Sequence, residues 1–406
     1  MRSVGIICEY NPPHKGHTYQ LQTLARRYPD AVRICVMGGH FTQRGTPSAA
    51  TKYARAKAAV LCGADLVLEL PFPWSMAPAE LFARGGVSIL NALDVDMLCF
   101  GTENDSIKPL LQAASHLDSE TFSREMDAAA KDPSFSGIGY PLLRDRVIRM
   151  LYGEEEAALL RLPNNTLGVE YLRAIRYCGS RMSPIAIKRR GAMHDAPAED
   201  AENAFASASA IRKLLSDGDR EGAYARLPLA TSNVLQEEAA EGRLCLHPDA
   251  AAGTLLLHCF RSTDPDCLSQ YVGLSGGVAQ RLCRIAGNAA TLDAFFAEAQ
   301  TKKYTNAALR RAAWYGFFSC RPEEVQSPVP YTLLLAANER GTAFLSKRRK
   351  ESFPILTRPA AYRTCTDDVQ RSFLRAQYAD EVYGMLLDRP IAAAEWMRMG
   401  PYIARH

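Results

Sequence analysis

The sequence predicts an α/β protein, with a Rossmann-like parallel sheet over residues 1–225 and a mainly helical C-terminal domain over residues 226–406. Three observations support this. In the first hundred residues, short apolar runs rich in β-branched side chains alternate with helical patterns, which is typical of βαβ units and a parallel sheet. After about residue 225 the pattern becomes mostly helical, with a break at residues 328–330. The chain is also longer than one ordinary core allows.

The first hundred residues contain apolar runs that end at a glycine, a proline or a polar turn, and each run predicts a strand. Helical patterns with recognisable stops lie between these runs; Gly63, for example, ends the second one. The expected strands are residues 4–8, 32–37, 66–70 and 97–100, and the expected helices begin at His17, cover residues 51–61 and cover residues 80–93.

The following stretch completes the predicted sheet. Residues 105–162 look helical and polar. A Leu-Pro-Asn-Asn turn then leads into an expected helix over residues 167–177, for which Asn165 is the expected cap. Residues 184–188 are the expected last strand, and Ser207 opens a further helix.

Polar residues and glycines gather where the predicted strands end. In parallel α/β sheets, ligands bind beyond the carboxyl ends of the strands. The sequence therefore predicts a binding site formed by these segments. They are residues 8–17, 37–44, 69–74 and 101–104.

Composition excludes several classes of protein. Hydrophobic residues make up 47% and charged residues 23%, which is ordinary for a soluble globular protein. No apolar run approaches the roughly 18–20 residues that span a bilayer, and no signal peptide is visible, so we expect a cytoplasmic protein without a membrane partner. The 11 cysteines are scattered without a Cys-x-x-Cys pair, which indicates reduced thiols and no metal site. A net charge of +4 does not by itself indicate nucleic-acid binding.

The most informative motif is His14-Lys15-Gly16-His17, which follows the first predicted strand and a proline-rich turn. The start of a helix presents unpaired N–H groups and positive dipole character, which suit a phosphate. Two imidazoles in the same turn would stabilise a triphosphate whose α-phosphorus is attacked. The motif resembles the HxGH signature of the nucleotidyltransferase superfamily. The alternative is a strand-to-helix turn with two surface histidines.

A second phosphate anchor is expected at residues 207–212, which resemble the SSTxIR-type motif of the same superfamily. There Ser209, Arg212 and the amides of the helix start would hold the β- and γ-phosphates. The alternative is an ordinary helix cap with a solvated arginine. Arg44 and Lys52 are further candidate cations near the triphosphate or the acceptor. The predicted catalytic residues are His14, Lys15, His17, Ser209 and Arg212.

Taken together, these motifs and several others in the same order resemble the bacterial tRNA(Met) cytidine acetate ligases. Members of that family make acetyl-adenylate from ATP and acetate, and then acetylate N4 of the wobble cytidine in elongator tRNA(Met). The shared segments are residues 4–17, 36–45, 63–71, 100–103, 163–165 with 170–172, 187–189 followed by His194-Asp195, 208–212, and 302–305 with 309–311.

The resemblance implies an ATP site, with Mg²⁺ expected beside the nucleotide. It covers a continuous N-terminal segment and three separate residues farther along. These residues are Ile7, Cys8, Glu9, Tyr10, Asn11, Pro12, Pro13, His14, Lys15, Gly16, His17, Thr18, Tyr19, Gln20, Gly101, Asn165 and Arg189.

The chain departs from the family pattern at two places. Gly38-Gly39-His40 stands where the family usually has Ser-Gly-Asn, and Pro13 stands where it usually has Phe. The first change touches a loop that could face the acyl group or the phosphates. The choice of acetate is therefore less secure than the adenylation itself.

Basic residues late in the chain are the expected contacts for tRNA. A helix beginning near Thr305 would carry them on one face, and a second basic cluster covers residues 347–350. Phosphate contacts of this kind weaken steeply with salt. Tyr304, Trp314 and Tyr315 could stack on a splayed base. The alternative is a solvated basic face above core aromatics. The predicted tRNA-binding residues are Lys303, Tyr304, Arg310 and Arg311.

Two other functions use the same residues. A small-molecule adenylyltransferase would need the same HxGH site, but such enzymes are usually shorter than this chain. A non-catalytic RNA-binding protein with a degenerate nucleotide fold would not need intact His14, His17, Ser209 and Arg212.

Overall fold

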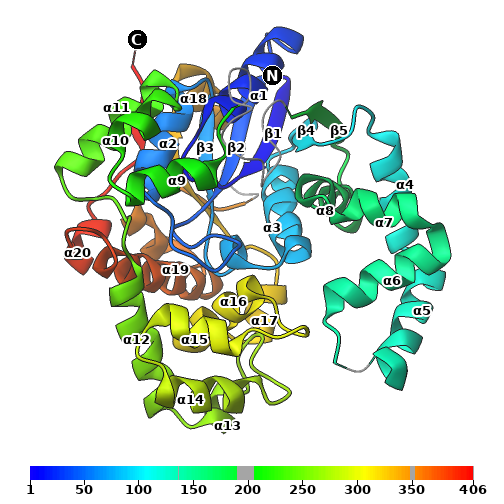
Figure 1. Cartoon of the computed structure of the whole chain (residues 1–406). Coiled ribbons are helices and arrows are strands. Elements are labelled where there is room, and N and C mark those ends of the chain that lie inside the picture. The colour runs from blue at the N-terminus through cyan, green and yellow to red at the C-terminus, as the bar shows by residue number, and fades with distance from the viewer. Residues whose placement is uncertain (136, 190–204, 348–352, 406) are drawn as a thin grey trace.

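The computed structural model describes residues 1–135, 137–189, 205–347 and 353–405. Its centre is an eight-stranded sheet in the order β5-β4-β1-β2-β3-β6-β7, with β8 paired to β6 (Figure 1). The first five strands pair in parallel, so the predicted α/β class with a parallel sheet is confirmed. They are β1 (Ser3–Cys8), β2 (Val32–Gly38), β3 (Leu66–Leu70), β4 (Met97–Thr102) and β5 (Ser183–Lys188).

Helices cover both faces of this sheet, which is why the central strands are apolar along their whole length. Ile34 and Val36 of β2 belong to the core on the face of α3 and α8. Cys35 and Met37, one position along, belong to the core on the face of α1 and α2. The helices between the strands are α1 (Lys15–Arg27), α2 (Lys52–Leu61), η1 (Trp74–Met76) and α3 (Ala79–Ala92).

A group of helices between β4 and β5 projects beside the sheet (Figure 1). The last of them begins at Pro163, with Leu162 as its N-cap, because proline is well suited to a first helical turn. The prediction that Asn165 caps this helix is therefore wrong: Asn165 lies inside it and is fully buried. The elements are α4 (Lys108–Leu117), α5 (Glu120–Lys131), η2 (Pro133–Phe135), α6 (Tyr140–Tyr152), α7 (Glu154–Arg161) and α8 (Pro163–Tyr177).

The helices after β5 lie over α2 (Figure 1). Ile211 and Leu215 pack with Ala54 and Ala58 of α2 in one small apolar cluster. This contact holds the predicted second phosphate anchor against the sheet domain. The three helices are α9 (Ala208–Ser216), α10 (Arg220–Ala225) and α11 (Leu229–Ala240).

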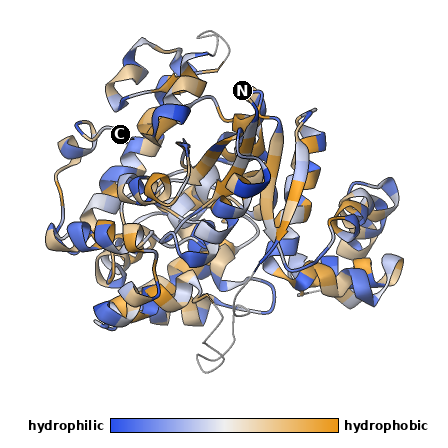
Figure 2. Ribbon diagram, turned by 90° about the horizontal axis from the view of Figure 1, so that it is seen from above, coloured by the Kyte–Doolittle hydropathy of each residue, from blue (hydrophilic) through white to orange (hydrophobic). Residues whose placement is uncertain are grey.

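The C-terminal half is mainly helical, and its core also includes Phe41, Phe72 and Met76 from the segments that follow β2 and β3. Seen from above, hydrophobic residues gather on the strands, while the surrounding helices mix both kinds (Figure 2). None of the helices described is long and apolar enough to span a bilayer. The helices are α12 (Asp249–Ser262), α13 (Pro265–Leu268), α14 (Val278–Asn288), α15 (Leu292–Ala299), α16 (Asn306–Phe317), α17 (Pro322–Gln326), α18 (Glu339–Ser346), η3 (Pro359–Thr364), α19 (Asp367–Met385) and α20 (Ala393–Trp396).

The prediction that β5 is the last strand is wrong. β6 (Thr332–Ala337) pairs antiparallel with β3, and β7 (Ile355–Leu356) and β8 (Tyr402–Ile403) pair with β6. All of β6 is buried, and a short, fully buried strand shows no alternation that separates it from a buried helix. The division at residue 225 stays a prediction, although the chain returns to the N-terminal sheet beyond it.

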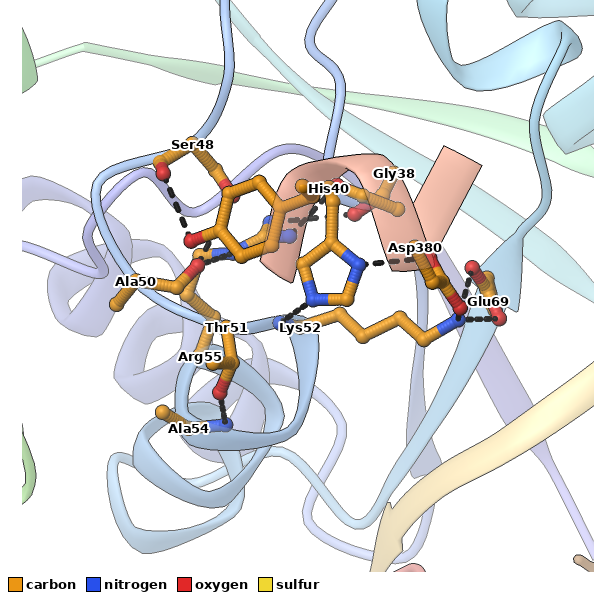
Figure 3. Close-up of polar contacts among 12 residues, drawn as sticks. Gly38, His40, Ser48, Ala50, Thr51, Lys52, Ala54, Arg55, Glu69 and Asp380 are labelled. Carbon is orange, nitrogen blue, oxygen red and sulfur yellow. Dashed lines mark hydrogen bonds and ion pairs between the residues drawn. The ribbon is translucent and has the colours of Figure 1, made fainter. Parts of the chain in front are cut away.

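A buried charged network ties α19 to the sheet domain (Figure 3). Lys52 is 2% exposed, and its Nζ lies 2.8 Å from Glu69 and 2.6 Å from Asp380. His40 donates from Nδ1 to Asp380 at 2.7 Å and accepts from the Lys52 main-chain N–H at 3.0 Å. Both carboxylates hold the Lys52 ammonium inside the fold, so the prediction that Lys52 lies near the triphosphate or the acceptor is wrong.

The neutral state of His40 predicts a pH-dependent contribution to stability. Burial lowers the pKa of His40 to about 4, against the raising effect of Asp380. Between that value and the ordinary pKa of about 6.5, the unfolded chain binds a proton that the folded chain does not, so stability is lost as pH falls. Between pH 7 and pH 4, we expect the free energy of unfolding of wild type to fall by about 3 kcal/mol more than that of His40→Asn. Urea unfolding of both proteins measures this difference. A His40→Asn difference that stays constant between pH 7 and pH 4 would contradict this.

Candidate active site at the carboxyl ends of the parallel strands

A cavity of about 470 Å³ opens at the carboxyl ends of β1, β4 and β5, where parallel sheets bind ligands. Its size suits a nucleotide-sized ligand. The start of α1 and the start of α9 form one side of it, and the loop between β2 and α2 forms another. Three of the four segments that the sequence predicted for the site, residues 8–17, 37–44 and 101–104, contribute to its wall, whereas residues 69–74 do not.

The two histidines of the HxGH motif lie together at the start of α1. His14 is the N-cap, so the helix begins at Lys15 rather than at His17 as predicted. The Gly16 N–H donates to His14 Nδ1 at 3.1 Å, and the His14 N–H donates to His17 Nδ1 at 3.2 Å. The rings stack with centroids 3.7 Å apart. Since each Nδ1 accepts a hydrogen bond, each neutral ring carries its proton on Nε2.

This arrangement favours neutral imidazoles, which act as hydrogen-bond donors at the cavity wall. The enclosed position of His17 lowers its pKa well below the usual value, and His14 and Arg189 lower it further. A neutral imidazole donates one hydrogen bond without adding a full charge to the ground state. A Cβ on Gly16 would lie 2.9 Å from His14 Cε1, so only glycine leaves that ring in place.

The second anchor is joined directly to the histidine turn. Ser207 is the N-cap of α9, as the sequence predicted for the start of this helix, and accepts from the Ala210 N–H at 3.1 Å. Arg212 donates to Ser209 Oγ at 3.1 Å and to the Asn11 carbonyl at 2.7 Å. Both Ser209 and Arg212 line the cavity. The alternative of a solvated arginine therefore does not describe Arg212.

The opposite end of the cavity is formed where β4 and β5 end. Gly101 and Arg189 line it, and a Cβ on Gly101 would lie 3.2 Å from the Arg189 side chain. Arg189 donates to Asn164 Oδ1 at 2.6 Å. Asn165 lies behind this wall, where its Oδ1 accepts from the Thr102 hydroxyl at 2.8 Å. Asn165 thus fixes the end of β4 rather than facing the cavity.

Most residues predicted for ATP line the cavity, while five do not. Twelve of them lie in its wall, and the predicted catalytic residues Ser209 and Arg212 join them: Ile7, Cys8, Glu9, Tyr10, Asn11, His14, Gly16, His17, Tyr19, Gln20, Gly101 and Arg189. The structure places Pro12, Pro13, Lys15, Thr18 and Asn165 outside that wall.

Lys15 needs a separate correction because it was predicted to be catalytic. Its side chain is exposed and its Nζ donates to the Ala225 carbonyl at 2.9 Å, at the end of α10. A lysine at the carboxyl end of a helix complements the dipole there. The structure therefore gives Lys15 a contact between helices in place of one with the cavity.

The sequence predicted that the loop after β2 lies at the site, but it did not single out the residues there other than Arg44. Thr42, Gln43 and Thr46 line the cavity together with Arg44. The His40 side chain, which the departure from the family pattern had brought into question, is 2% exposed and belongs to the buried network. The glycine pair after β2 was the signal in the sequence, but it did not indicate which side chains face inward.

The residues predicted for tRNA differ in their exposure. Thr305 caps α16, as expected. Lys303 is exposed, with its Nζ 5.4 Å from the centre of the half-buried Tyr304 ring. Arg310 donates to Asn306 at 2.7 Å and lies over the Phe296 ring.

Two features of this region correct the sequence interpretation. Trp314 and Tyr315 are 2% and 1% exposed, so they cannot stack on a base from outside. Arg311 donates to the Gln43 carbonyl at 2.8 Å, which joins α16 to the cavity loop. Residues 348–350 of the second basic cluster, and His194-Asp195, lie outside the described residues.

Metal ligands do not gather anywhere in the part of the chain that the structure describes: no group of His, Cys, Asp or Glu there could hold a metal ion. All 11 cysteines are free thiols.

Comparison with known proteins places this site in a family. A model of the HIGH nucleotidyl transferase family matches residues 1–395. The tRNA(Met) cytidine acetate ligase of Bacillus subtilis is 31% identical over 398 residues, with 96% of this chain and 94% of that protein covered. The protein of the same name from Syntrophotalea carbinolica is 36% identical over 363 residues, with 88% and 85% covered.

Two solved structures have a fold similar to this one along the whole chain. A crystal structure of Thermotoga maritima TmcAL bound with alpha-thio ATP matches with a TM-score of 0.88 at 29% identity, covering 100% of both chains. The apo form of the same protein matches with a TM-score of 0.91 at 28% identity.

Proposed function

Because this chain belongs to the tRNA(Met) cytidine acetate ligases of the HIGH nucleotidyl transferase family, we propose that it activates acetate with ATP and acetylates elongator tRNA(Met). In the first step an acetate oxygen attacks the α-phosphorus of ATP. The bond to the β-phosphate breaks, pyrophosphate leaves, and acetyl-adenylate forms. In the second step N4 of the wobble cytidine attacks the acetyl carbon, AMP leaves, and the amine gives up a proton.

One observation carries the first step: two imidazoles with their protons on Nε2 lie at a helix start inside a nucleotide-sized cavity. Phosphoryl and nucleotidyl transfer depend on positioning and on stabilising negative charge. His14 and His17 would donate to the oxygens between the α- and β-phosphates. Ser209 and Arg212 would hold the β- and γ-phosphates, and Gly101 and Arg189 would hold the adenosine.

The relative from Thermotoga maritima, crystallised with an ATP analogue, supports ATP as the nucleotide. Mg²⁺ would enter with the triphosphate, whose oxygens are ligands it prefers. We assign the ATP chemistry to residues 1–225 and tRNA binding to residues 226–406, and we expect both to operate in the cytoplasm. Enclosing the adenylate protects this reactive anhydride from water.

The names of the relatives favour this function over a small-molecule adenylyltransferase with the same histidines. The test is to incubate the protein with ATP, labelled acetate and total tRNA, and then to map the labelled nucleoside. We expect N4-acetylcytidine at the wobble position of elongator tRNA(Met), with one AMP and one pyrophosphate released per acetyl group. Transfer of AMP to a small acceptor, with no labelled tRNA, would contradict the proposal.

We expect Lys303→Ala with Arg310→Ala to weaken tRNA binding, because both side chains would lose contacts with phosphates. Lys303 is exposed and Arg310 is partly exposed, whereas Arg311 is left intact because it holds the cavity loop. The slope of log affinity against log salt should fall by about one per lost contact, while ATP binding is unchanged.

Matched charge loss elsewhere controls for net charge. Arg220 on α10 and Arg371 on α19 are both exposed, and their double alanine variant should retain the wild-type salt slope. Equal slopes in all three proteins would show that Lys303 and Arg310 do not contact the phosphates of the tRNA.

A further inference from the structure

Glu9 places a carboxylate in the wall of the cavity that is proposed to bind a triphosphate. The residue directly follows β1 and lines the cavity. Its side chain is a poor match for the nucleotide itself, because a carboxylate repels phosphates at close range. A carboxylate removed from bulk water needs a positively charged or proton-donating partner. Its presence in this wall therefore points to a ligand group other than a phosphate.

The Glu9 carboxylate has no cation of the protein as its partner. In the part of the chain that the structure describes, it forms no ion pair, and its Oε1 accepts one hydrogen bond, from the Gln43 N–H at 2.7 Å. Arg55 and Arg212 donate instead to main-chain carbonyls, those of Glu9 and Asn11 respectively. The negative charge of Glu9 is therefore left for a ligand to meet.

One oxygen of this carboxylate is accessible and held in place. Oε2 has no hydrogen-bond partner among the described residues, and it is not one of the enclosed side-chain atoms that lack a partner. It is therefore open to the cavity that Glu9 lines. The Gln43 N–H fixes Oε1, and Arg55 fixes the Glu9 carbonyl at 2.6 Å. Oε2 is thus a positioned acceptor in the wall of the site.

Glu9 also adjoins the part of the chain that is proposed to bind tRNA. The sheet order places β2 on the opposite side of β1 from β4 and β5, where the adenosine is proposed to lie. Gln43, in the loop after β2, donates its N–H to Glu9 and accepts at its carbonyl from Arg311 of α16 at 2.8 Å. A single residue therefore joins the carboxylate to the helix to which we assign tRNA contacts.

We propose that Glu9 is the catalytic base of the second step, and that its Oε2 accepts the proton of the cytidine amine. This assignment rests on the proposed function and adds a residue to it. N4 forms a bond to the acetyl carbon, the bond from that carbon to the phosphate oxygen breaks, and AMP leaves with the electron pair. The proton that N4 loses passes to Glu9 Oε2 and then to water. The amine is a weak nucleophile because its lone pair is delocalised into the ring, so a base at this point lowers the barrier.

The test compares the two steps in Glu9→Gln, which removes the base but keeps an oxygen that can accept from the Gln43 N–H. Transfer is measured in a single turnover with excess protein, synthetic acetyl-adenylate and elongator tRNA(Met), without ATP. We expect its rate to fall about 100-fold or more, the usual contribution of a general base. Acetate-dependent exchange of pyrophosphate into ATP needs no base, because the acetate ion carries no proton to remove. The exchange rate should therefore fall by less than about threefold.

Glu221→Gln at an exposed position of α10 is the control with the same change of charge, and it should leave both rates unchanged. Transfer at the wild-type rate in Glu9→Gln would refute the base and leave the proposed function standing. An equal loss of transfer and exchange, or exchange restored by added Mg²⁺, would mean that Glu9 serves ATP or its metal ion, which also refutes the base. If wild type transfers no acetyl group from acetyl-adenylate to the tRNA, the proposed function fails and the base fails with it.

Discussion

Replacing His17 by alanine is expected to reduce acetate-dependent pyrophosphate exchange by about 100- to 1,000-fold, the usual cost of losing one preorganised donor to a developing charge. The same loss is expected for His14, since both rings line the cavity and carry their protons on Nε2. The effect should fall on kcat more than on the KM for ATP, because the extra charge between the phosphates exists only in the transition state.

His14 requires a second variant because it also caps α1. Removing a cap costs about 0.5–2 kcal/mol of stability, and a destabilised protein could lose activity for that reason. Asparagine is a good N-cap but is too short to replace Nε2. His14→Asn should therefore fold like wild type and lose exchange like His14→Ala. Exchange at the wild-type rate in His14→Asn would show that the ring at residue 14 is only structural.

Replacing Lys52 by methionine is expected to destabilise the protein by about 3–5 kcal/mol, because it leaves Glu69 and Asp380 buried without their cation. Asp380 and Glu69 raise the pKa of Lys52 despite its burial, so the ammonium stays charged at neutral pH. Equilibrium unfolding in urea measures the change. Lys57 on the same helix pairs with Glu237 at the surface, and Lys57→Met should change stability by less than about 1 kcal/mol.

The Lys52→Met defect should also depend on pH. Burial raises the pKa of Glu69 to about 7 even with Lys52 present, and losing the lysine raises it further. A carboxyl group whose folded pKa exceeds its unfolded pKa gives stability that is lost as pH rises through the folded value. The variant should therefore be closer to wild type at pH 5 than at pH 8. Equal defects at both values, or a defect below about 1 kcal/mol, would show that the network does not depend on Lys52.

Local signals in the sequence were sufficient for much of the fold. The strands β1 to β5 begin or end within about two residues of their predicted limits, because their apolar runs are bounded by glycine, proline and polar residues. The HxGH turn and the helix after Ser207 follow from cap and helix-start chemistry. β6 was missed because its pairing partner, β3, lies more than 260 positions earlier in the chain, and its buried run shows no period.

Only the site residues that belong to short local motifs could be predicted from the sequence. His14, His17 and Arg212 belong to short patterns. The positions of Lys52 and Gln43 depend instead on Asp380 and Arg311, which come from distant helices. The hydrophobic pattern of a sequence does not show which distant residues will contact each other. Lys52 was therefore placed near the nucleotide, and Gln43 was overlooked.

The most direct test of the account is a crystal structure of this chain with an unreactive ATP analogue. We expect the triphosphate over the start of α1, with Nε2 of His14 and of His17 within hydrogen-bond distance of oxygens on the α- and β-phosphates. An analogue bound away from that turn, or rings that turn from the phosphates, would contradict it.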